Sequence, residues 1–412
     1  MKALGESGIG PSMRSMRPLR VAVVGCGTAG PALALMLHRD GHDVRLIERV
    51  AEPGPVGAGI LLQHLGQEVL HRMGLGDTLR AQSPEVTRVD ATAMDGRVVM
   101  GFDYADLPGG VPGWGVHRGT LLQTLLDAVR AEGVPLETGV TVTAVRPDDR
   151  GVVVRTNTAG DRSFDLVIGA DGAASVVRRE SGLARHDRVY PYGALWAVVD
   201  DPEQRGGAAL YQRYHGTRHY LGTLPTGLGR SSVFWSIRER DIDSAMTEGV
   251  DAWREQARPF AGEHDYLLDR VTHLLPARYR HVGCRQPDRH HPHRDAGVVL
   301  LGDAAHGMSP QLGAGGSLAL ADAWTLAAML RRHDSVTAAL TAYRSQRRAH
   351  IRWYAFFSSL MVPAFQSDLD VLAWPRDHVL GAMTAQPWVR RIMVSTLMGA
   401  QTSPWSSWSL PD

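Results

Sequence analysis

Lysine is almost missing from this sequence of 412 residues: Lys2 is its only lysine, and every other basic residue except histidine is an arginine. The scarcity excludes mechanisms that need a buried catalytic lysine, such as Schiff-base chemistry on a carbonyl substrate. It also leaves no lysine in the body of the chain to hold a phosphate group.

Cysteine and long apolar runs are scarce as well. Cys26 and Cys284 are too few for a disulfide framework or a four-thiolate metal site, and we expect no metal. No run approaches the roughly 18 apolar residues of a membrane helix, so we expect no membrane span. Residues 1–18 lack the apolar stretch of a signal peptide. We expect them to be a flexible extension and the protein to be cytoplasmic.

An excess of charge of either sign is also absent. The 44 Lys and Arg residues balance 43 Asp and Glu residues, which leaves a net charge of +1. This balance gives no electrostatic case for nucleic-acid binding. The composition, 44% hydrophobic and 21% charged, is that of a globular protein. At roughly 100–200 residues per domain, the length predicts two or three domains.

The first motif that carries chemistry is a glycine pattern between a strand and a helix. Residues 19–24 form an apolar β-branched run, and the pattern Gly25-x-Gly27-x-x-Gly30 follows it. Residues 31–39 predict a helix, and residues 44–48 a second strand that ends in Glu48. Such glycines let the backbone approach a pyrophosphate at a helix N-terminus, and the acid suits a ribose diol. The pattern predicts a dinucleotide site.

Two further motifs follow later buried strands. DLVIGADG at residues 165–172 continues with Ser175 and Arg178. LGDAAH at residues 301–306 continues with a proline and glycines before a predicted helix at residues 317–331. An aspartate there can accept hydrogen bonds from hydroxyl groups, and a glycine-rich turn that opens a helix offers backbone donors.

Together the three motifs resemble the signatures of group A flavin monooxygenases, the para-hydroxybenzoate hydroxylase-like family. The resemblance covers nearly the whole chain. It implies an α/β fold with a glutathione-reductase-like FAD-binding domain on a mixed parallel sheet, an antiparallel-sheet substrate domain and a helical C-terminal segment. The FAD-binding domain is expected to be discontinuous, from residues 19–85, 112–185 and 285–341. Residues 86–111 and 186–284 are expected to form the substrate domain, and residues 342–412 the helical segment.

The resemblance also implies which residues bind FAD. They lie in the three motifs, at the end of the second strand, at the start of the helix at residues 117–132 and on the adenine side: Gly25, Gly27, Ala29, Gly30, Glu48, Arg49, Arg118, Val142, Asp171, Gly302, Asp303, Pro310, Gly313, Gly315, Gly316 and Ser317. The sequence departs from the family pattern at Ser317, where an asparagine is usual, and at His64, where a proline is common. His64 and Pro310 are candidate catalytic residues, since a histidine can act as a base near neutral pH.

The substrate is expected to lie between the flavin and the strand-rich stretch at residues 190–237. Four aromatic residues there are candidate contacts: Trp196, Tyr211, Tyr220 and Trp235. Aromatic walls favour a flat, apolar small molecule. His215 and His219 are further candidate bases if the substrate is a phenol, and Arg213 and Arg218 could attract an anionic group.

The function implied is that of a monooxygenase. NADH or NADPH, bound transiently, would reduce FAD, and O2 would then form a flavin C4a-hydroperoxide. That species would deliver one oxygen atom to an electron-rich aromatic or polycyclic metabolite, by hydroxylation or epoxidation. A flavin-dependent oxidase or dehydrogenase, and a non-redox cyclase on the same fold, remain open alternatives. A flavin halogenase is excluded, because its active-site lysine and Trp-x-Trp-x-Ile-Pro signature are missing. The nicotinamide preference and the oligomeric state are not encoded in any motif.

Overall fold

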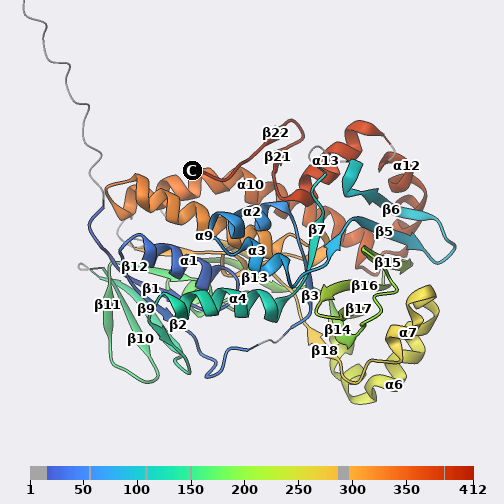
Figure 1. The fold of residues 1–412 in the computed structure, drawn as a ribbon, viewed down its shortest axis with the longest axis horizontal. Helices are drawn as coiled ribbons and strands as arrows, with labels where there is room; N and C mark the ends of the chain where they lie inside the picture. Colours follow the sequence, from blue (N-terminus) through green and yellow to red (C-terminus); the bar gives the residue numbers. More distant parts are fainter. Residues whose placement is uncertain (1–15, 55–56, 107–109, 149–150, 286–296, 385) are drawn as a thin grey trace, which may run out of the picture.

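The computed structural model describes residues 16–54, 57–106, 110–148, 151–285, 297–384 and 386–412. Most of the expected flexible extension, residues 1–15, lies outside them. At the start of the described chain, Arg17 donates a hydrogen bond of 3.1 Å to Asp165. Two sheets organise the molecule: in Figure 1 a parallel sheet with its helices fills the left half, and a larger sheet with α6 and α7 fills the right half.

The parallel sheet has the strand order β20-β12-β1-β2-β8. Every neighbouring pair in it is parallel. Its strands are β1 (Arg20–Val24), β2 (Asp43–Ile47), β8 (Leu136–Glu137), β12 (Leu166–Gly169) and β20 (Val298–Leu300). The central strands are buried on both faces, as their unbroken apolar runs predict. One face packs on α1 (Ala29–Arg39), α4 (Arg118–Ala131) and α9 (Gly315–Arg332).

Smaller sheets flank the parallel one. One of them is formed by the hairpin of β9 (Val142–Asp148) and β10 (Gly151–Thr156) together with β11 (Arg162–Phe164). A second three-stranded sheet contains β3 (Gly59–Leu62), β4 (Glu85–Val86) and β7 (Gly113–His117), next to α2 (His64–Arg72) and α3 (Gly76–Arg80). A two-stranded ribbon joins β13 (Ala184–Val189) to β19 (Arg280–Cys284), and α5 (Val176–Glu180) precedes it.

The larger sheet has seven strands in the order β18-β14-β17-β16-β15-β5-β6. It is antiparallel except where β15 runs parallel to β5, so it is mixed. Its strands are β5 (Arg88–Ala93), β6 (Val98–Asp103), β14 (Tyr192–Asp200), β15 (Ala209–His215), β16 (His219–Gly227), β17 (Arg230–Arg238) and β18 (Leu275–Ala277). The segment after β17 forms α6 (Ile242–Ala261) and α7 (Asp265–Leu268), two helices that no sequence pattern predicted.

The two faces of the seven-stranded sheet pack against different partners. On one face Leu195, Leu221 and Trp235 form a core with α6 and α7. On the other face Tyr220 and Phe234 form a core with Phe365 from the C-terminal helices. Neighbouring residues on a strand point to opposite faces, so each strand contributes to both cores.

The C-terminal part is helical, as expected, up to Met398. It contains α10 (Val336–Phe365), η5 (Asp370–Leu372), α11 (Ala373–Pro375), η6 (Arg376–Leu380), α12 (Gly381–Thr384) and α13 (Pro387–Met398). A hairpin of β21 (Gln401–Ser403) and β22 (Ser406–Ser407) follows and lies beside α10. No helix within the described ranges is long and apolar enough to span a membrane.

Trp235 offers a test of how the sheet faces are assigned. Its ring lies 4.9 Å from that of Phe260 on α6, and it is almost fully buried. We predict that Trp235→Ala lowers the free energy of unfolding by about 3–5 kcal/mol, because it opens a cavity under α6. Trp405→Ala, at a side chain that is 92% exposed, should change it by less than about 0.5 kcal/mol. Denaturant unfolding of both variants measures the difference, and an equally small effect of Trp235→Ala would contradict the assignment.

Candidate functional site

The three sequence motifs meet at one edge of the parallel sheet. They follow β1, β12 and β20, which are neighbours in that sheet. The Ala170 N–H donates to Val24 O at 2.8 Å, and the Leu301 N–H donates to Gly169 O at 2.9 Å. Because parallel strands end at the same edge, the loops after them share one crevice, the usual place for a ligand in such sheets.

The glycine loop after β1 is shaped by close backbone contacts. Gly25 has φ +104°, and a Cβ on it would lie 2.5 Å from Ala170 O in the second motif. A Cβ on Gly30 would lie 1.9 Å from Gly25 O, so α1 packs directly against the loop. A Cβ on Gly27 would meet no atom within 4 Å, which leaves open space above the loop. No side chain caps the N-terminus of α1, which starts at Ala29.

The acid at the end of β2 lies beside this loop. Glu48 Oε2 accepts a hydrogen bond of 2.7 Å from the Cys26 N–H, and Oε1 accepts one of 2.8 Å from the Val50 N–H. The next residue, Arg49, is exposed. Val142, at the start of β9, is buried in the core that also contains Ile47. The structure therefore brings Glu48, Arg49 and Val142, all predicted from the sequence, close to the end of β2.

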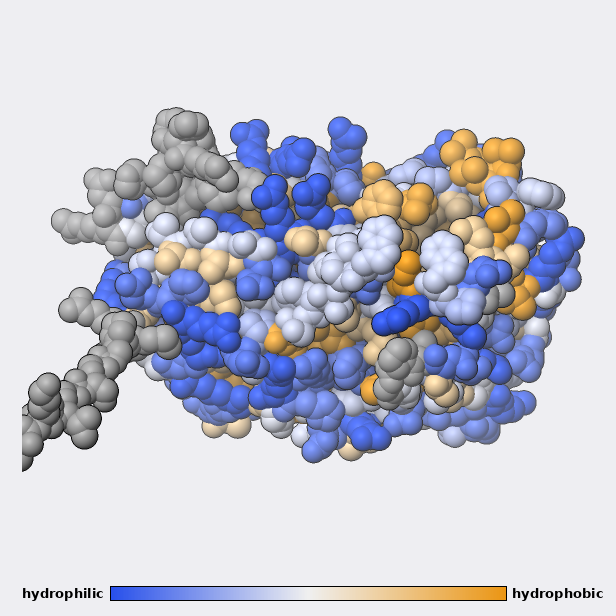
Figure 2. All heavy atoms as spheres, turned by 90° about the horizontal axis from the view of Figure 1, so that it is seen from above, coloured by the Kyte–Doolittle hydropathy of each residue, from blue (hydrophilic) through white to orange (hydrophobic). Residues whose placement is uncertain are grey.

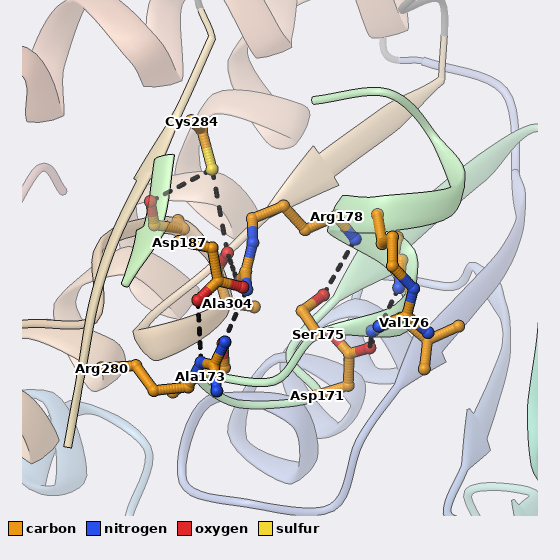
Figure 3. Close-up of polar contacts among 12 residues, drawn as sticks. Asp171, Ala173, Ser175, Val176, Arg178, Asp187, Arg280, Cys284 and Ala304 are labelled. Carbon is orange, nitrogen blue, oxygen red and sulfur yellow. Dashed lines mark hydrogen bonds and ion pairs between the residues drawn. The ribbon is translucent and has the colours of Figure 1, made fainter. Parts of the chain in front are cut away.

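The second motif caps α5. Asp171 Oδ2 accepts hydrogen bonds from the Val176 and Val177 N–H groups, and Ser175 Oγ accepts one from the Arg178 N–H (Figure 3). Asp171 Oδ1 is buried and has no hydrogen-bond partner among the described residues. A buried carboxylate oxygen without a donor is costly, so it marks a place where a ligand or water would donate.

Arg178 joins the second motif to the third. Its buried guanidinium donates to Ala304 O at 2.9 Å, to Ala173 O at 2.6 Å and to Asp187 at 2.6 Å, as the dashed lines in Figure 3 show. Arg280 donates to the same carboxylate. Burial alone would raise the pKa of Asp187, but hydrogen bonds from Arg280 and Arg178 outweigh it and lower the pKa. The position of Arg178 in the motif was noted from the sequence, whereas its linking role depends on residues far along the chain.

The third motif is anchored by a buried acid on α9. Asp322 Oδ2 accepts hydrogen bonds from the Gly302 N–H at 2.9 Å and from His306 Nε2 at 2.6 Å. Its Oδ1 accepts one of 2.7 Å from Arg347 Nε on α10. Burial acts to raise the pKa of this carboxyl, but Arg347 and His306 outweigh it and hold the pKa well below its ordinary value. The side chain of Asp303, the first residue of α8 (Asp303–His306), takes no part in these hydrogen bonds and is exposed.

The start of α9, which follows the turn η4 (Pro310–Leu312), lies next to Asp303. A Cβ on Gly315 would lie 4.0 Å from Asp303 Oδ1, and one on Gly316 would lie 3.3 Å from Ile60 Cδ1. Gly313 ends the turn with φ 59°. Ser317 points elsewhere: its buried hydroxyl accepts a hydrogen bond of 3.3 Å from the Gln63 N–H at the start of α2.

The predicted residues outside the strand ends are distributed as follows. The N–H of Arg118 donates to Ala58 O at 3.2 Å, and its side chain lies against Gly57, so it lies where β7 ends and β3 begins. His64 is half-buried in the first turn of α2, one residue after Gln63. Catalytic roles for His64 and Pro310 stay predictions.

The four predicted substrate contacts do not share a face of the seven-stranded sheet. Trp196 and Tyr220 lie on the face that carries Phe234. Trp235 packs under α6, and the ring of Tyr211 lies 4.3 Å from that of His264 just after α6. The candidate bases also lie on the α6 face, His219 against Trp235 and His215 against Phe260. Only the first pair lies on the face that packs against the C-terminal helices.

Two residues beside Trp196 and Tyr220 were missed from the sequence. Tyr279 Oη accepts a hydrogen bond of 3.2 Å from Trp196 Nε1. Burial raises its pKa to about 12, against the smaller opposing effects of Trp196 and of the Arg118 charge. Gln311, in η4, donates to Gln366 at 2.6 Å and opposes the rise that burial causes in the pKa of Tyr220. Gln311 directly follows Pro310 and could have been noticed there, but Tyr279 had no motif to mark it.

Comparison with known proteins is consistent with this geometry. Residues 18–356 match the family described as FAD binding domain. The 3-amino-4-hydroxybenzoate 2-monooxygenase of Streptomyces cremeus is 32% identical over 346 residues, covering 80% of this chain and 84% of that protein. The FAD-dependent urate hydroxylase of Klebsiella pneumoniae is 27% identical over 340 residues, covering 81% and 87%. The solved structure of Klebsiella pneumoniae HpxO complexed with FAD and uric acid has the same fold, with a TM-score of 0.77 at 23% identity over 92% of this chain and 96% of that one.

The buried acid on α9 generates one prediction. Asp322→Asn leaves Arg347 and His306 without their counter-charge, and we expect a loss of about 3–5 kcal/mol in the free energy of unfolding. Asp334→Asn, at an exposed position beyond the same helix, is the control and should change it by less than about 0.5 kcal/mol. Thermal and denaturant unfolding test this, and a cost for Asp322→Asn as small as that of the control would contradict it.

A second prediction concerns pH. Burial, with Arg347 adding to it, lowers the pKa of His350 to about 3, and its Nε2 donates to Gly399 O at 2.7 Å. The unfolded chain takes up this proton first, near pH 6.5, as the pH falls. The stability that neutral His350 contributes is therefore complete above about pH 6.5 and is lost progressively toward pH 3. In His350→Gln the stability should fall less steeply in this window, and an unchanged pH profile would count against the assignment.

Proposed function

Because the chain belongs to the FAD-binding-domain family and is an FAD-dependent monooxygenase of the para-hydroxybenzoate hydroxylase-like group, we propose that it hydroxylates a small aromatic molecule at the crevice of the three motifs. The reductant is NADH or NADPH and the co-substrate is O2. One observation carries the proposal: three motifs that lie far apart in the sequence converge at the ends of three adjacent parallel strands.

The residues around the glycine loop fit the adenosine diphosphate half of FAD. The open space at Gly27 and the uncapped N-terminus of α1 suit a pyrophosphate, whose charge the helix dipole favours. Glu48 is held beside the loop and can accept the ribose hydroxyls. Gly25, Ala29 and Gly30 shape the cradle, with Arg49 and Val142 on its adenine side. Asp171 offers its unpartnered Oδ1 to a donor on the cofactor or on a bound water.

The third motif fits the flavin half. Asp303 is exposed toward Gly315 and can accept hydroxyl hydrogens of the ribityl chain, while Gly302 is fixed behind it by Asp322. The turn at Pro310, Gly313 and Gly316 supplies backbone next to the ring, and Arg118 supplies a positive charge. Ser317 contributes indirectly, by holding the start of α2, because its hydroxyl accepts a hydrogen bond from the Gln63 N–H. Bound FAD would supply the redox chemistry, accepting a hydride from the nicotinamide and passing one oxygen atom of O2 to the substrate while the other leaves as water.

The substrate is bound by the sheet face that carries Trp196 and Tyr220. Tyr279 stays protonated at neutral pH, and since its oxygen accepts from Trp196, its hydrogen is available to an acceptor on the substrate. Aromatic side chains on this face suit a flat ring and exclude water from it. The names of the relatives support this class, because they act on an aminohydroxybenzoate and on urate.

Oxygen transfer is the decisive test of this proposal. The purified protein is loaded with FAD and supplied with NADH or NADPH, with ¹⁸O2 and with a panel of hydroxybenzoates, hydroxypyridines and purines. A monooxygenase of this kind incorporates one ¹⁸O atom into an aromatic product, and that substrate accelerates nicotinamide oxidation. Substrate oxidation without ¹⁸O incorporation would replace the proposal by an oxidase, and a rearranged product with no redox change by a cyclase.

The glycine loop allows the cofactor site to be tested separately from folding. Gly27→Ala adds a methyl group where the protein leaves open space, so the apoprotein should keep its thermal stability, within about 0.5 kcal/mol. The methyl group should meet the pyrophosphate and weaken FAD binding by about tenfold or more. Gly160→Ala, also in open space but far from the motifs, is the control. Flavin fluorescence titration gives the affinities, and equal affinity in the two variants would contradict the placement of the pyrophosphate.

A further inference from the structure

A glutamine is buried at the end of α10, where the usual order of polar and apolar side chains is reversed. Phe356 and Leu360 on this helix are more than half exposed, whereas Gln366, which ends it, is only 2% exposed. Figure 2 shows further apolar side chains at the surface of the right-hand end, where Figure 1 places α12 and α13. Burying an amide costs free energy unless it is hydrogen-bonded, so the position of Gln366 draws attention to its partners.

The hydrogen bonds of Gln366 fix which way its amide faces. Its Nε2 donates to Gly193 O at 3.1 Å and to Ser236 Oγ at 3.2 Å. A carbonyl oxygen can only accept, and Ser236 Oγ gives its own hydrogen to Arg218 O at 2.8 Å. Both partners must therefore receive hydrogens from Gln366, and its amide cannot be turned over without losing both bonds. It follows that Gln366 presents Oε1 to its next neighbour, Gln311.

Gln311 is oriented in turn by Gln366. Its Nε2 donates to Gln366 Oε1 at 2.6 Å, so its NH2 group faces the end of α10. A side-chain hydrogen bond from Gln311 also opposes the rise that burial causes in the pKa of Tyr220, which indicates that the second hydrogen of this group is directed at the Tyr220 hydroxyl. The Oε1 of Gln311 accepts no hydrogen bond from the described residues and is not enclosed. One acceptor is therefore left open on this side chain.

The open acceptor lies between the third motif and the proposed substrate face. Gln311 belongs to η4, the turn that leads into α9, and Tyr220 lies on the sheet face that carries Trp196. Tyr279 is near enough to Tyr220 to affect its pKa, and its hydroxyl oxygen is already occupied by the Trp196 donor. This junction therefore offers an incoming ring one acceptor, on Gln311, and one donor, the Tyr279 hydroxyl.

We propose that Gln311 Oε1 selects substrates whose aromatic ring carries a hydroxyl or amino group, and that Gln366 is the positioning residue that keeps this oxygen turned toward the ring. The inference rests on the proposed function and narrows its substrate class. An O–H or N–H substituent can donate to Gln311, whereas a ring that bears only acceptors would leave Oε1 unpaired once water is excluded. Hydroxyl and amino groups also make the ring electron-rich, as oxygen transfer to it requires.

Paired ligands test this selection without turnover. The FAD-loaded protein is titrated with 3- and 4-hydroxybenzoate and the matching methoxybenzoates, and with 3- and 4-aminobenzoate and their dimethylamino counterparts, while the flavin absorption reports binding. We expect the donor-bearing member of at least one pair to bind about tenfold or more tightly than its methylated partner. Gln311→Met removes the acceptor at nearly constant size and should lower this preference by about tenfold. It should do so by weakening the donor-bearing ligand.

The positioning role is tested at Gln366. In Gln366→Met the Gln311 amide is free to turn its NH2 group toward the ring, so the preference should fall by about threefold or more, mainly because the methylated ligand binds more tightly. Gln366→Glu keeps an oxygen that accepts from Gln311 and should retain the preference. Gln256→Met makes the same change at an exposed glutamine on α6 and should leave both affinities unaltered.

The ratio of the two affinities separates this role from a structural one. General loosening of the site would weaken both members of a pair alike, and crowding by the added methyl group would persist in every variant. The proposal is overturned if the wild-type protein binds neither member of any pair, or binds both members of every pair equally. It is also overturned if the preference survives in Gln311→Met or Gln366→Met, or is lost in Gln366→Glu.

Failure of this inference can be told from failure of the proposed function, because binding is measured without reaction. A protein that shows the preference but incorporates no ¹⁸O would keep the roles of Gln311 and Gln366 in ligand selection and lose the monooxygenase reaction. A protein that incorporates ¹⁸O but shows no preference would keep the reaction and lose these roles.

Discussion

The buried carboxylate of Asp322 holds three separate parts of the chain in register. It accepts the Gly302 N–H after β20, His306 from α8 and Arg347 from α10. Arg347 contacts His350 and lies 4.7 Å from the ring of Trp408, and His350 binds the carbonyl of Gly399. A buried charge is tolerated only when donors surround it, so these groups cannot move independently. The loop that presents Asp303 is therefore fixed by the C-terminal helices as well as by its own strand.

Arg178 connects separate segments of the chain on the other side of the crevice. Its guanidinium reaches from the second motif to the carbonyl of Ala304 in the third motif, and to Asp187 on the β13–β19 ribbon. Between them, Asp322 and Arg178 fix the third motif from two directions. The seven-stranded sheet carries Trp196 and Tyr220 on the face that packs against the C-terminal helices, while α6 covers its other face. We therefore expect a cofactor site at these strand ends to be largely formed before the cofactor binds.

Local patterns allowed much of this to be predicted, and long-range contacts account for the rest. The glycine loop, Glu48 and the two later motifs are short patterns next to β-branched runs, and the family to which they point is confirmed by the match over residues 18–356. The faces of Trp196 and Trp235 were not predictable, because both faces of the sheet are buried and no polar alternation marks them. Helix α6 was missed where Gly249, with φ 89°, and Pro259 interrupt its helical pattern. The partners of Asp322 and the position of Tyr279 depend on packing between distant segments, which no local pattern records.

Anaerobic titration with a nicotinamide is the most direct test that the three strand ends form one working flavin site. Purified protein, reconstituted with FAD if necessary, is titrated with NADH and separately with NADPH, with and without an aromatic substrate, while the flavin absorption is recorded. We predict one FAD per chain, bleaching by one of the two nucleotides and recovery of the oxidised spectrum in air. A protein that binds no FAD after reconstitution would contradict it, as would bound FAD that neither nucleotide reduces under any of these conditions.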